Sequence, residues 1–301
     1  MRGLVDVRIE DNIECRITNA TLEKRLSEDL VNGHIRAEQW FRDASLWYEL
    51  AISYNNPYNH RKVHSELFLL HQKRDDLAGF LKDATPVFYG IGVGETEIEL
   101  VGWQLEYAGY AEAIGIDVNS RFIQKFVGGL RNKAKENPEY AIMFLGYNSL
   151  FDQITPEDLQ PENSRFGRRA HICLGNTIGN YEDQNEIMGL FCSNSAQGDL
   201  LVLGFQLDTD LEILFRKYST NLDFWRLILA WDGNPDYSAL RWELDRENGL
   251  VKARYRGLEV FRSRKFNPVM LKGIVENHGY EFATEVIDED RNACIQIYGR
   301  N

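Results

Sequence analysis

"VFYGIGVGETEIEL", residues Val87–Leu100, joins an apolar stretch of high β propensity to a run with helical periodicity. Three glycines, Gly90, Gly92 and Gly94, stand at alternate positions between the two. A glycine-rich turn between a strand and a helix lets a ligand approach the backbone closely and points helix N-terminal amides at it. The stretch therefore predicts the first strand, loop and helix of a nucleotide-binding α/β sheet.

Short apolar strands alternate with helical patterns on both sides of this stretch. Strands are predicted at 87–89, 111–118, 140–146, 169–176 and 198–207, and helices at 96–105, 120–134 and 182–195. This alternation indicates a parallel, doubly wound sheet with helices on both faces. Beyond it, a helical stretch over 210–231 and alternating residues over 238–261 predict an inserted α+β cap. A helix and an antiparallel hairpin are expected to follow up to residue 300, which is how methyltransferase-type sheets finish.

Composition limits the class of partner. The chain has 301 residues, of which 44% are hydrophobic and 27% charged, and its net charge is −12. An acidic surface argues against nucleic acid or an anionic membrane as the main partner. No apolar run approaches the roughly 20 residues of a membrane span, and the N-terminus is a poor signal peptide, so we expect a cytoplasmic protein. The cysteines and histidines lack metal-ligand spacing, and no metal site is predicted.

The first loop suits an adenosine ligand. Asp117 closes the second predicted strand, where a carboxylate accepts both hydroxyls of a ribose. This combination fits NAD, FAD or S-adenosylmethionine. Glu95 directly follows the glycines, and its charge suits a sulfonium or ammonium better than a pyrophosphate. Together with the C-terminal hairpin, it favours S-adenosylmethionine. The alternative is that the glycines only form a tight strand–helix turn.

A second loop, "CLGNTIGNYED" at Cys173–Asp183, follows the fourth predicted strand. Catalytic groups of open α/β sheets lie at the carboxyl ends of strands. The amides of Asn176 and Asn180 both donate and accept hydrogen bonds, so they can orient an amine without protonating it. For Asn180 the alternative role is to cap the next helix.

The motif "GNTIGN" closely resembles "GSTIGN" of the ergothioneine-pathway histidine Nα-methyltransferases. Further motifs of the chain match that family in order and rough spacing over about residues 38–300: "WFRDA" resembles its "WFYDA", "PYNHR" its "YYPTR", "GIGVGETE" its "GSGTSEKT", "GIDVNS" its "VDVS" and "FRSRKF" its "EVSAKF". The resemblance implies a Rossmann-like class I methyltransferase sheet, with S-adenosyl-L-methionine as cofactor and an α+β substrate-binding cap. The expected parts are 1–75, the N-terminal helical part of the substrate-binding domain; 76–207, the cofactor-binding domain; 208–266, the inserted cap; and 267–301, the helix and hairpin that complete the sheet.

Site residues follow from the loops and the resemblance together. The cofactor is expected to be held by Gly90, Gly92, Gly94, Glu95, Asp117, Tyr147, Asn148 and Asn176. The acceptor is expected to be contacted by Arg42, Tyr58, Asn180, Tyr218, Phe261 and Ser263, with Asn180 and Tyr58 as the catalytic pair. In the resembling family, Tyr218 matches a tyrosine that holds the acceptor's carboxylate end, and Ser263 matches a serine near its side chain.

Departures from the family pattern concern both ligands. Phe261 stands where the family has a glutamate that binds imidazole, and Arg42 replaces a tyrosine. An apolar ring cannot accept the imidazole N–H, and an unpaired group costs roughly 1–3 kcal/mol. On the cofactor side, Phe88 and Tyr147 replace acids, so Tyr147 is expected to stack on adenine and Asn148 to bond its edge.

These observations predict an S-adenosylmethionine-dependent methyltransferase of specialised metabolism. Its acceptor is expected to be a small amino-acid-like or amine molecule, methylated on nitrogen, and not free histidine. Methyl transfer from a sulfonium needs proximity and an aimed lone pair more than acid–base groups. Two alternatives remain. The same fold and cofactor would support C- or O-methylation or transfer of another sulfonium group, or the chain is a binding protein that has lost the cofactor.

Overall fold

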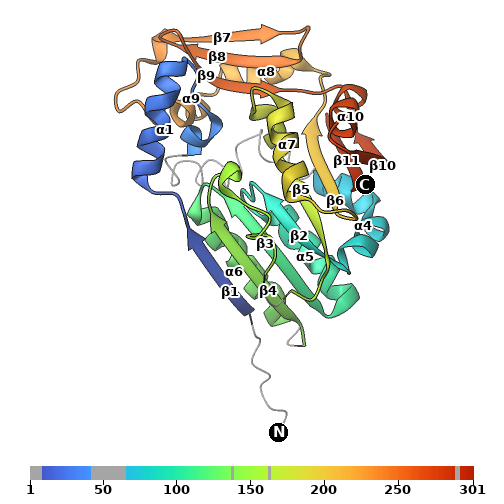
Figure 1. Ribbon diagram of the computed structural model, residues 1–301. Helices are drawn as coiled ribbons and strands as arrows, with labels where there is room; N and C mark the ends of the chain where they lie inside the picture. Colours follow the sequence, from blue (N-terminus) through green and yellow to red (C-terminus); the bar gives the residue numbers. More distant parts are fainter. Residues whose placement is uncertain (1–8, 42–65, 137–138, 162–163, 289–291) are drawn as a thin grey trace.

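The computed structural model describes residues 9–41, 66–136, 139–161, 164–288 and 292–301 (Figure 1). Its centre is an eight-stranded sheet with the order β1-β4-β3-β2-β5-β6-β11-β10. The strands are β1 Ile9–Cys15, β2 Ala84–Tyr89, β3 Tyr110–Asp117, β4 Ala141–Asn148, β5 Arg168–Cys173, β6 Leu200–Gln206, β10 Tyr280–Asp288 and β11 Ala293–Arg300. Neighbours are parallel except that β11 runs antiparallel to both β6 and β10, which confirms the predicted doubly wound sheet and terminal hairpin.

Helices cover both faces of this sheet. They are α4 Arg74–Leu81, α5 Glu95–Ala108, α6 Ser120–Glu136, α7 Gln184–Asn194 and α10 Pro268–Glu276, and residues 66–72 are helical as well. One face packs against α4, α5 and α6, and the other packs against α7 and α10. Because β2 lies in the middle of the sheet, all its residues are buried. Val87 packs toward α7, whereas Phe88 packs toward α5 and α6.

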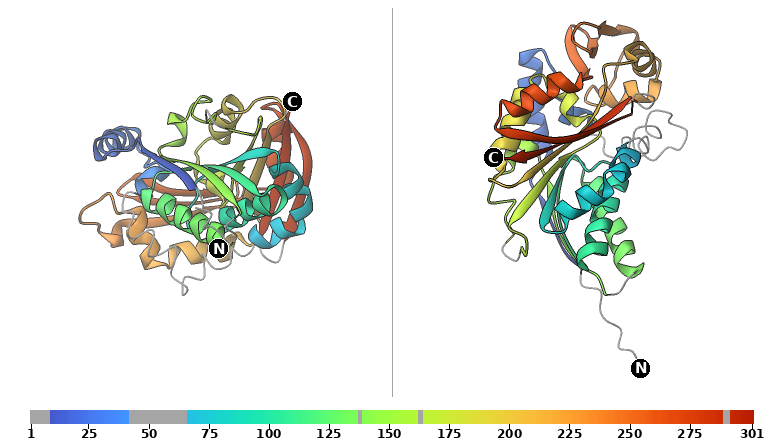
Figure 2. Two further views of the ribbon diagram at one scale, coloured as in Figure 1. Left: turned by 90° about the horizontal axis from the view of Figure 1, so that it is seen from below. Right: turned by 90° about the vertical axis from the view of Figure 1, so that its right-hand side faces the viewer.

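The cap forms a second, smaller layer. It consists of α1 Asn19–Asn32, η1 Ala37–Phe41, α8 Leu211–Ser219, α9 Leu222–Ile228, η4 Tyr237–Ala239 and the antiparallel sheet of β7 Leu240–Asp245, β8 Leu250–Tyr255 and β9 Leu258–Arg264. These elements share one hydrophobic cluster, separate from the two that flank the central sheet. Figure 1 and the right-hand view of Figure 2 place the cap at one end of the central sheet.

The N-terminal part differs from the prediction that residues 1–75 are a helical piece of the substrate-binding domain. β1 belongs to the central sheet, where it pairs in parallel with β4 from Ile9↔Ile142 to Cys15↔Asn148. The strand IEDNIEC is mostly polar, so its sequence lacks the apolar pattern that identified the inner strands. The helix α1 follows, with Thr18 accepting from Thr21 N–H at its N-terminus.

The helical stretch expected over 210–231 is two helices rather than one. Asn221 separates α8 from α9. Its side chain accepts a hydrogen bond from the backbone N–H of Phe224 at 3.0 Å and caps the N-terminus of α9. Among the described residues, no helix is both long enough and apolar enough to cross a membrane.

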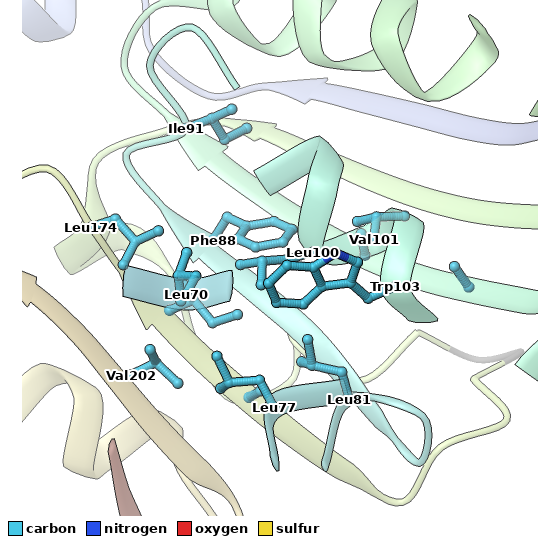
Figure 3. Close-up of a cluster of buried hydrophobic side chains, with 14 of the residues drawn as sticks. Leu70, Leu77, Leu81, Phe88, Ile91, Leu100, Val101, Trp103, Leu174 and Val202 are labelled. Atoms are coloured by element: carbon cyan, nitrogen blue, oxygen red, sulfur yellow. The ribbon is translucent and has the colours of Figure 1, made fainter. Parts of the chain in front are cut away.

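The core beneath α5 is dominated by large side chains. Figure 3 shows Phe88 of β2 against Leu100 and Trp103 of α5, with Leu70 beside them. Phe88 also contacts Phe126 of α6 edge to face, with ring centroids 5.7 Å apart. Phe88 therefore fixes the helices that follow the glycine loop and does not face a ligand.

We expect Trp103→Ala to lower the free energy of unfolding by about 3–5 kcal/mol, because it empties a large volume in this core. Urea unfolding followed by circular dichroism measures the change. Tyr107→Ala, on the exposed side of the same helix, is the matched control, with an expected change within about 0.5 kcal/mol. Equal unfolding midpoints for the two variants would contradict the assignment of Trp103 to the core.

Candidate active site

The carboxyl ends of β2, β3 and β5 open into a cavity of about 520 Å³ whose walls come from both the central sheet and the cap. This size lies within the range of about 300–1,000 Å³ that is usual for small-molecule sites. The predicted site residues that line it are Gly90, Gly92, Gly94, Glu95, Asp117, Asn176, Asn180, Tyr218, Phe261 and Ser263. The structure thus brings both predicted loops and the predicted cap residues to one place.

The glycine loop presents bare backbone to this cavity. Gly92 has φ +58°, a left-handed conformation that side chains disfavour. A Cβ atom built on Gly92 would meet no other atom within 4 Å, so the space beside the loop is open. Gly94 ends the loop, also with positive φ, and α5 starts at Glu95. Its first-turn amides stand beside the cavity, as the sequence predicted.

Asp117 stands at the end of β3 and ties the loop to that strand. Its Oδ2 accepts from the backbone N–H of Gly92 at 3.0 Å, and its Oδ1 accepts from that of Asn119 at 2.7 Å. The backbone of Ile91 also hydrogen-bonds to this carboxylate. A carboxylate accepts about four hydrogen bonds, so one position remains for a ribose hydroxyl. Burial raises the pKa of Asp117 to about 7.

Glu97 adds a buried carboxyl that the sequence analysis missed. Burial, together with the nearby carboxyls of Glu66, Asp117 and Glu95, raises its pKa to about 8. Glu66 also faces the cavity, and its Oε1 accepts from the N–H of Gly175 at 2.8 Å. A signal for Glu97 was present, because it shares the inward-facing helical period of Leu100, Val101 and Gln104.

These four carboxyl groups suit a cationic ligand. Close acids repel one another when ionised, and a positive charge among them removes that cost. S-adenosylmethionine carries two positive charges, on its sulfonium and its ammonium. The residues present therefore fit the predicted cofactor, with Asp117 for the ribose and the glutamates for the cationic end.

Asn176 holds the second loop in place. Its Oδ1 accepts from the N–H of Gln206 at 3.1 Å, and its Nδ2 donates to the carbonyl of Arg264 at 3.2 Å and to Ser263 Oγ at 3.3 Å. These bonds connect η3, Thr177–Asn180, to β6 and β9. Although Asn176 lines the cavity, its amide is engaged by the protein, so its position favours a role in orienting the loop over direct cofactor binding.

Asn180 ends η3 and lines the cavity. The capping role considered for it belongs to Asp183, whose carboxylate accepts from the N–H of Asn185 at 2.9 Å. No hydrogen bond of the Asn180 amide to another described residue is present. Its donor and its acceptor therefore both stay available to a ligand, which supports the predicted contact with the acceptor.

Tyr147 and Asn148 do not line the cavity, so their predicted adenine contacts do not fit their positions. The hydroxyl of Tyr147 donates to the Asp158 carbonyl at 2.8 Å, and the Arg16 guanidinium lies 4.6 Å from its ring centroid. Asn148 donates to the carbonyls of Asp117 and Val118 and so holds the end of β3. The side chains that line the cavity here are apolar: Val118, Phe122, Leu150 and Phe151.

The cap end of the cavity is aromatic. Phe261 of β9 lies 4.9–5.0 Å, centroid to centroid, from Trp40, Tyr218 and Phe224. Trp40, Tyr218 and Phe224 also line the cavity. Trp40 and Phe224 come from η1 and α9 and were not among the predicted site residues, although both segments were assigned to the substrate-binding domain. Arg42 and Tyr58, the other predicted acceptor residues, lie outside the described residues.

A family model described as "Histidine-specific methyltransferase, SAM-dependent" matches residues 34–226. The chain belongs to this family. The protein is therefore an S-adenosylmethionine-dependent methyltransferase.

Two of the solved structures to which the chain is similar are described as methyltransferases. Magnesium protoporphyrin IX methyltransferase from Synechocystis PCC 6803, with bound S-adenosylhomocysteine, is 15% identical over 88% of this chain and 98% of its own, at a TM-score of 0.49. The N-methyltransferase NodS from Bradyrhizobium japonicum WM9 is 11% identical over 87% of this chain and 98% of its own, at 0.44. These values are too low to support any inference about the acceptor. No curated protein sequence matches the chain.

We expect the affinity for S-adenosylmethionine to increase as the pH rises from 6 to 8.5. Asp117, with a pKa of about 7, and Glu97, with a pKa of about 8, hold protons at the lower pH. A cationic ligand favours the ionised carboxylates, so binding releases protons until both groups are ionised. Displacing one pKa by one unit corresponds to about tenfold in affinity.

Calorimetric titration across this range measures the effect. S-adenosylhomocysteine, which lacks the sulfonium charge, is the control ligand and should show a shallower pH dependence. Glu97→Gln should bring the two pH profiles closer together. Identical profiles for both ligands on the wild-type methyltransferase would show that these carboxyls do not face the sulfonium.

Gly179→Ala should slow turnover with little effect on cofactor affinity. Its Cβ would stand 2.3 Å from the Arg264 carbonyl oxygen and 2.4 Å from Asn176 Nδ2, so η3 and its Asn180 must move away from β9. A displacement near 1 Å can cost about 100-fold in rate. Gly189→Ala in α7, where a Cβ meets nothing within 4 Å, is the control for kcat. Equal kcat values for the two variants would show that the position of η3 does not affect turnover.

Proposed function

We propose that the methyltransferase methylates a nitrogen of a small amino-acid-like or amine acceptor other than free histidine. The observation that carries this proposal is Phe261. It occupies the position where the resembling histidine Nα-methyltransferases have an imidazole-binding glutamate. It is 3% exposed and in ring contact with Trp40, Tyr218 and Phe224, so an imidazole N–H placed against it would have no acceptor.

The chemistry asks little of the protein beyond placement. Methyl transfer from a sulfonium is an in-line displacement, in which the acceptor lone pair attacks the methyl carbon and the thioether leaves. Asn180 is suited to orient the amine, because its amide accepts an N–H without taking the proton. Aromatic rings of the cap can hold the amine as an ammonium before it loses that proton. Tyr58 remains a predicted partner in this step.

The size of the expected discrimination follows from the missing hydrogen bond. A buried donor left unpaired costs about 1–3 kcal/mol, or roughly 5- to 150-fold in affinity. An apolar or aromatic part of the acceptor would instead gain contact area against Phe261. The family is named for histidine. The presence of Phe261 in place of the family's glutamate is therefore the sequence difference that favours an acceptor other than histidine.

We expect histidine to be a poorer acceptor than amino acids or amines with an apolar or aromatic part. Initial rates of S-adenosylhomocysteine release, at equal acceptor concentration, measure this preference, and mass spectrometry of the products identifies the methylated atom. Histidine as the best acceptor would refute the proposal. Products methylated on carbon or oxygen, or carrying another group from the sulfonium, would support the alternative reactions.

Two substitutions at Phe261 test its role. Phe261→Glu should reduce the rate with the best acceptor at least about tenfold, because it buries a carboxylate among aromatic rings. Phe261→Leu keeps the apolar wall and should lose less. If the rate falls as much in the leucine variant as in the glutamate variant, the aromatic ring of Phe261 is required for activity, and an apolar side chain alone is not sufficient. Failure to bind S-adenosylhomocysteine in calorimetry would favour a protein without the cofactor.

A further inference from the structure

The hydroxyl of Ser263 has an unusual environment at the cap end of the cavity. Ser263 is two residues beyond Phe261 on β9, is buried and lines the cavity. Lys265 Nζ lies 2.9 Å from its Oγ, and Asn176 Nδ2 lies 3.3 Å away. The direction of these two hydrogen bonds decides what Ser263 can offer a ligand.

Both neighbours are donors. An ammonium has three N–H groups and no lone pair, so Lys265 can only donate to Ser263. The orientation of the Asn176 amide is fixed by two backbone groups, since its oxygen accepts from Gln206 N–H and its nitrogen donates to the Arg264 carbonyl. The nitrogen of Asn176 therefore faces Ser263.

The consequence is that Ser263 acts as a donor. A hydroxyl oxygen has two lone pairs, and here both receive hydrogen bonds, which leaves its own proton to be donated. No hydrogen bond from this hydroxyl to another described residue is present, and the side chain stands at the cavity wall. Its proton is thus available to a ligand.

A second donor belongs to a ring of the same aromatic wall. The indole Nε1–H of Trp40 is buried and has no hydrogen-bond partner among the described residues. Trp40 is 2% exposed, lines the cavity, and its ring lies 5.0 Å from that of Phe261. A buried N–H without a partner costs about 1–3 kcal/mol, and a ligand atom with a lone pair would remove this cost.

We propose that Ser263 and Trp40 form a donor subsite for a hydrogen-bond-accepting oxygen of the acceptor molecule, carried on the apolar part that contacts Phe261. The subsite selects for an oxygen without a proton of its own, as in an ether, a carbonyl or a carboxylate, and against an N–H group. This inference rests on the proposed function. It specifies the class of acceptor, an amine whose apolar part carries an accepting oxygen, which Phe261 alone does not define.

Lys265 is a positioning residue in this arrangement. It is almost fully buried behind Ser263, and it also donates to the Gln206 side chain and, at 3.2 Å, to the Tyr218 hydroxyl. Its part is to keep the Ser263 lone pairs occupied. Without it, the Ser263 hydroxyl could rotate and accept a hydrogen bond, and the selection against N–H groups would weaken.

The test uses three groups of equal shape on phenylalanine: methoxy, ethyl and methylamino, each at ring positions 2, 3 and 4. They present an accepting oxygen, no polar atom and an N–H, respectively. Binding of all nine to the methyltransferase with S-adenosylhomocysteine is measured by calorimetry. We expect the methoxy compound at one position to bind at least about tenfold more tightly than both of its partners. In Ser263→Ala this preference should vanish while the affinity of the ethyl compound stays within about twofold.

Lys265→Met should reduce the preference for methoxy over methylamino about tenfold, with circular dichroism confirming the fold. Lys272→Met, on the surface of α10, is the matched control and should leave the preference unchanged. The inference is overturned if no compound binds, if the ethyl or methylamino compound is best at every position, or if the preference persists in Ser263→Ala. Release of S-adenosylhomocysteine with other amines would, in those cases, leave the proposed function standing.

Discussion

Buried negative charge at the carboxyl edge of the sheet is the constraint on which the site depends. Asp117 and Glu97 are nearly inaccessible to water, and their pKa values are raised because burial penalises the ionised form. A protein built only for stability would place apolar residues there. The arrangement makes sense with a ligand that places its sulfonium and ammonium groups among the carboxyls, since these positive charges reduce the repulsion between the ionised acids. The left-handed turn at Gly92 matters for the same reason, because the backbone N–H of this residue donates to the Asp117 carboxylate and no side chain covers the loop there.

The side-chain amide of Asn176 connects the two ends of the cavity by hydrogen bonds. Asn176 follows β5, and its side chain bonds to the backbone of both β6 and β9 as well as to Ser263. β6 belongs to the sheet that carries the cofactor end, whereas β9 belongs to the cap. The close approach of Gly179 to the β9 backbone gives the same connection a second contact. The segment around η3 thus connects the central sheet to the cap through both a side-chain amide and a close backbone approach.

Much of this was predictable because the fold depends on local patterns. The inner strands are continuous apolar runs, and the loop glycines and Asp117 occupy positions that follow directly from the strand–turn–helix geometry. β1 was not predicted, because a strand at the edge of a sheet buries few side chains and its sequence can stay polar. Tyr147 was misplaced for a different reason: its position in the chain was right, but the direction of its side chain depends on Arg16 and Asp158, which are distant in sequence. Glu97 was overlooked because a single acid within an apolar helical period is normally a surface residue.

The strand order also constrains the sequence of events by which the chain can fold. β10 is connected to the rest of the sheet only through β11, and β11 comes after it in the chain. The hairpin of β10 and β11 can therefore join the sheet only through its later strand, β11, which pairs with β6. At the opposite edge, β1 can pair only with β4, which lies far along the chain, so this pairing forms only after β4 is available. Such long-range pairings slow folding and leave strand edges open in the meantime. The central strands can assemble progressively, but both margins of the sheet are completed late.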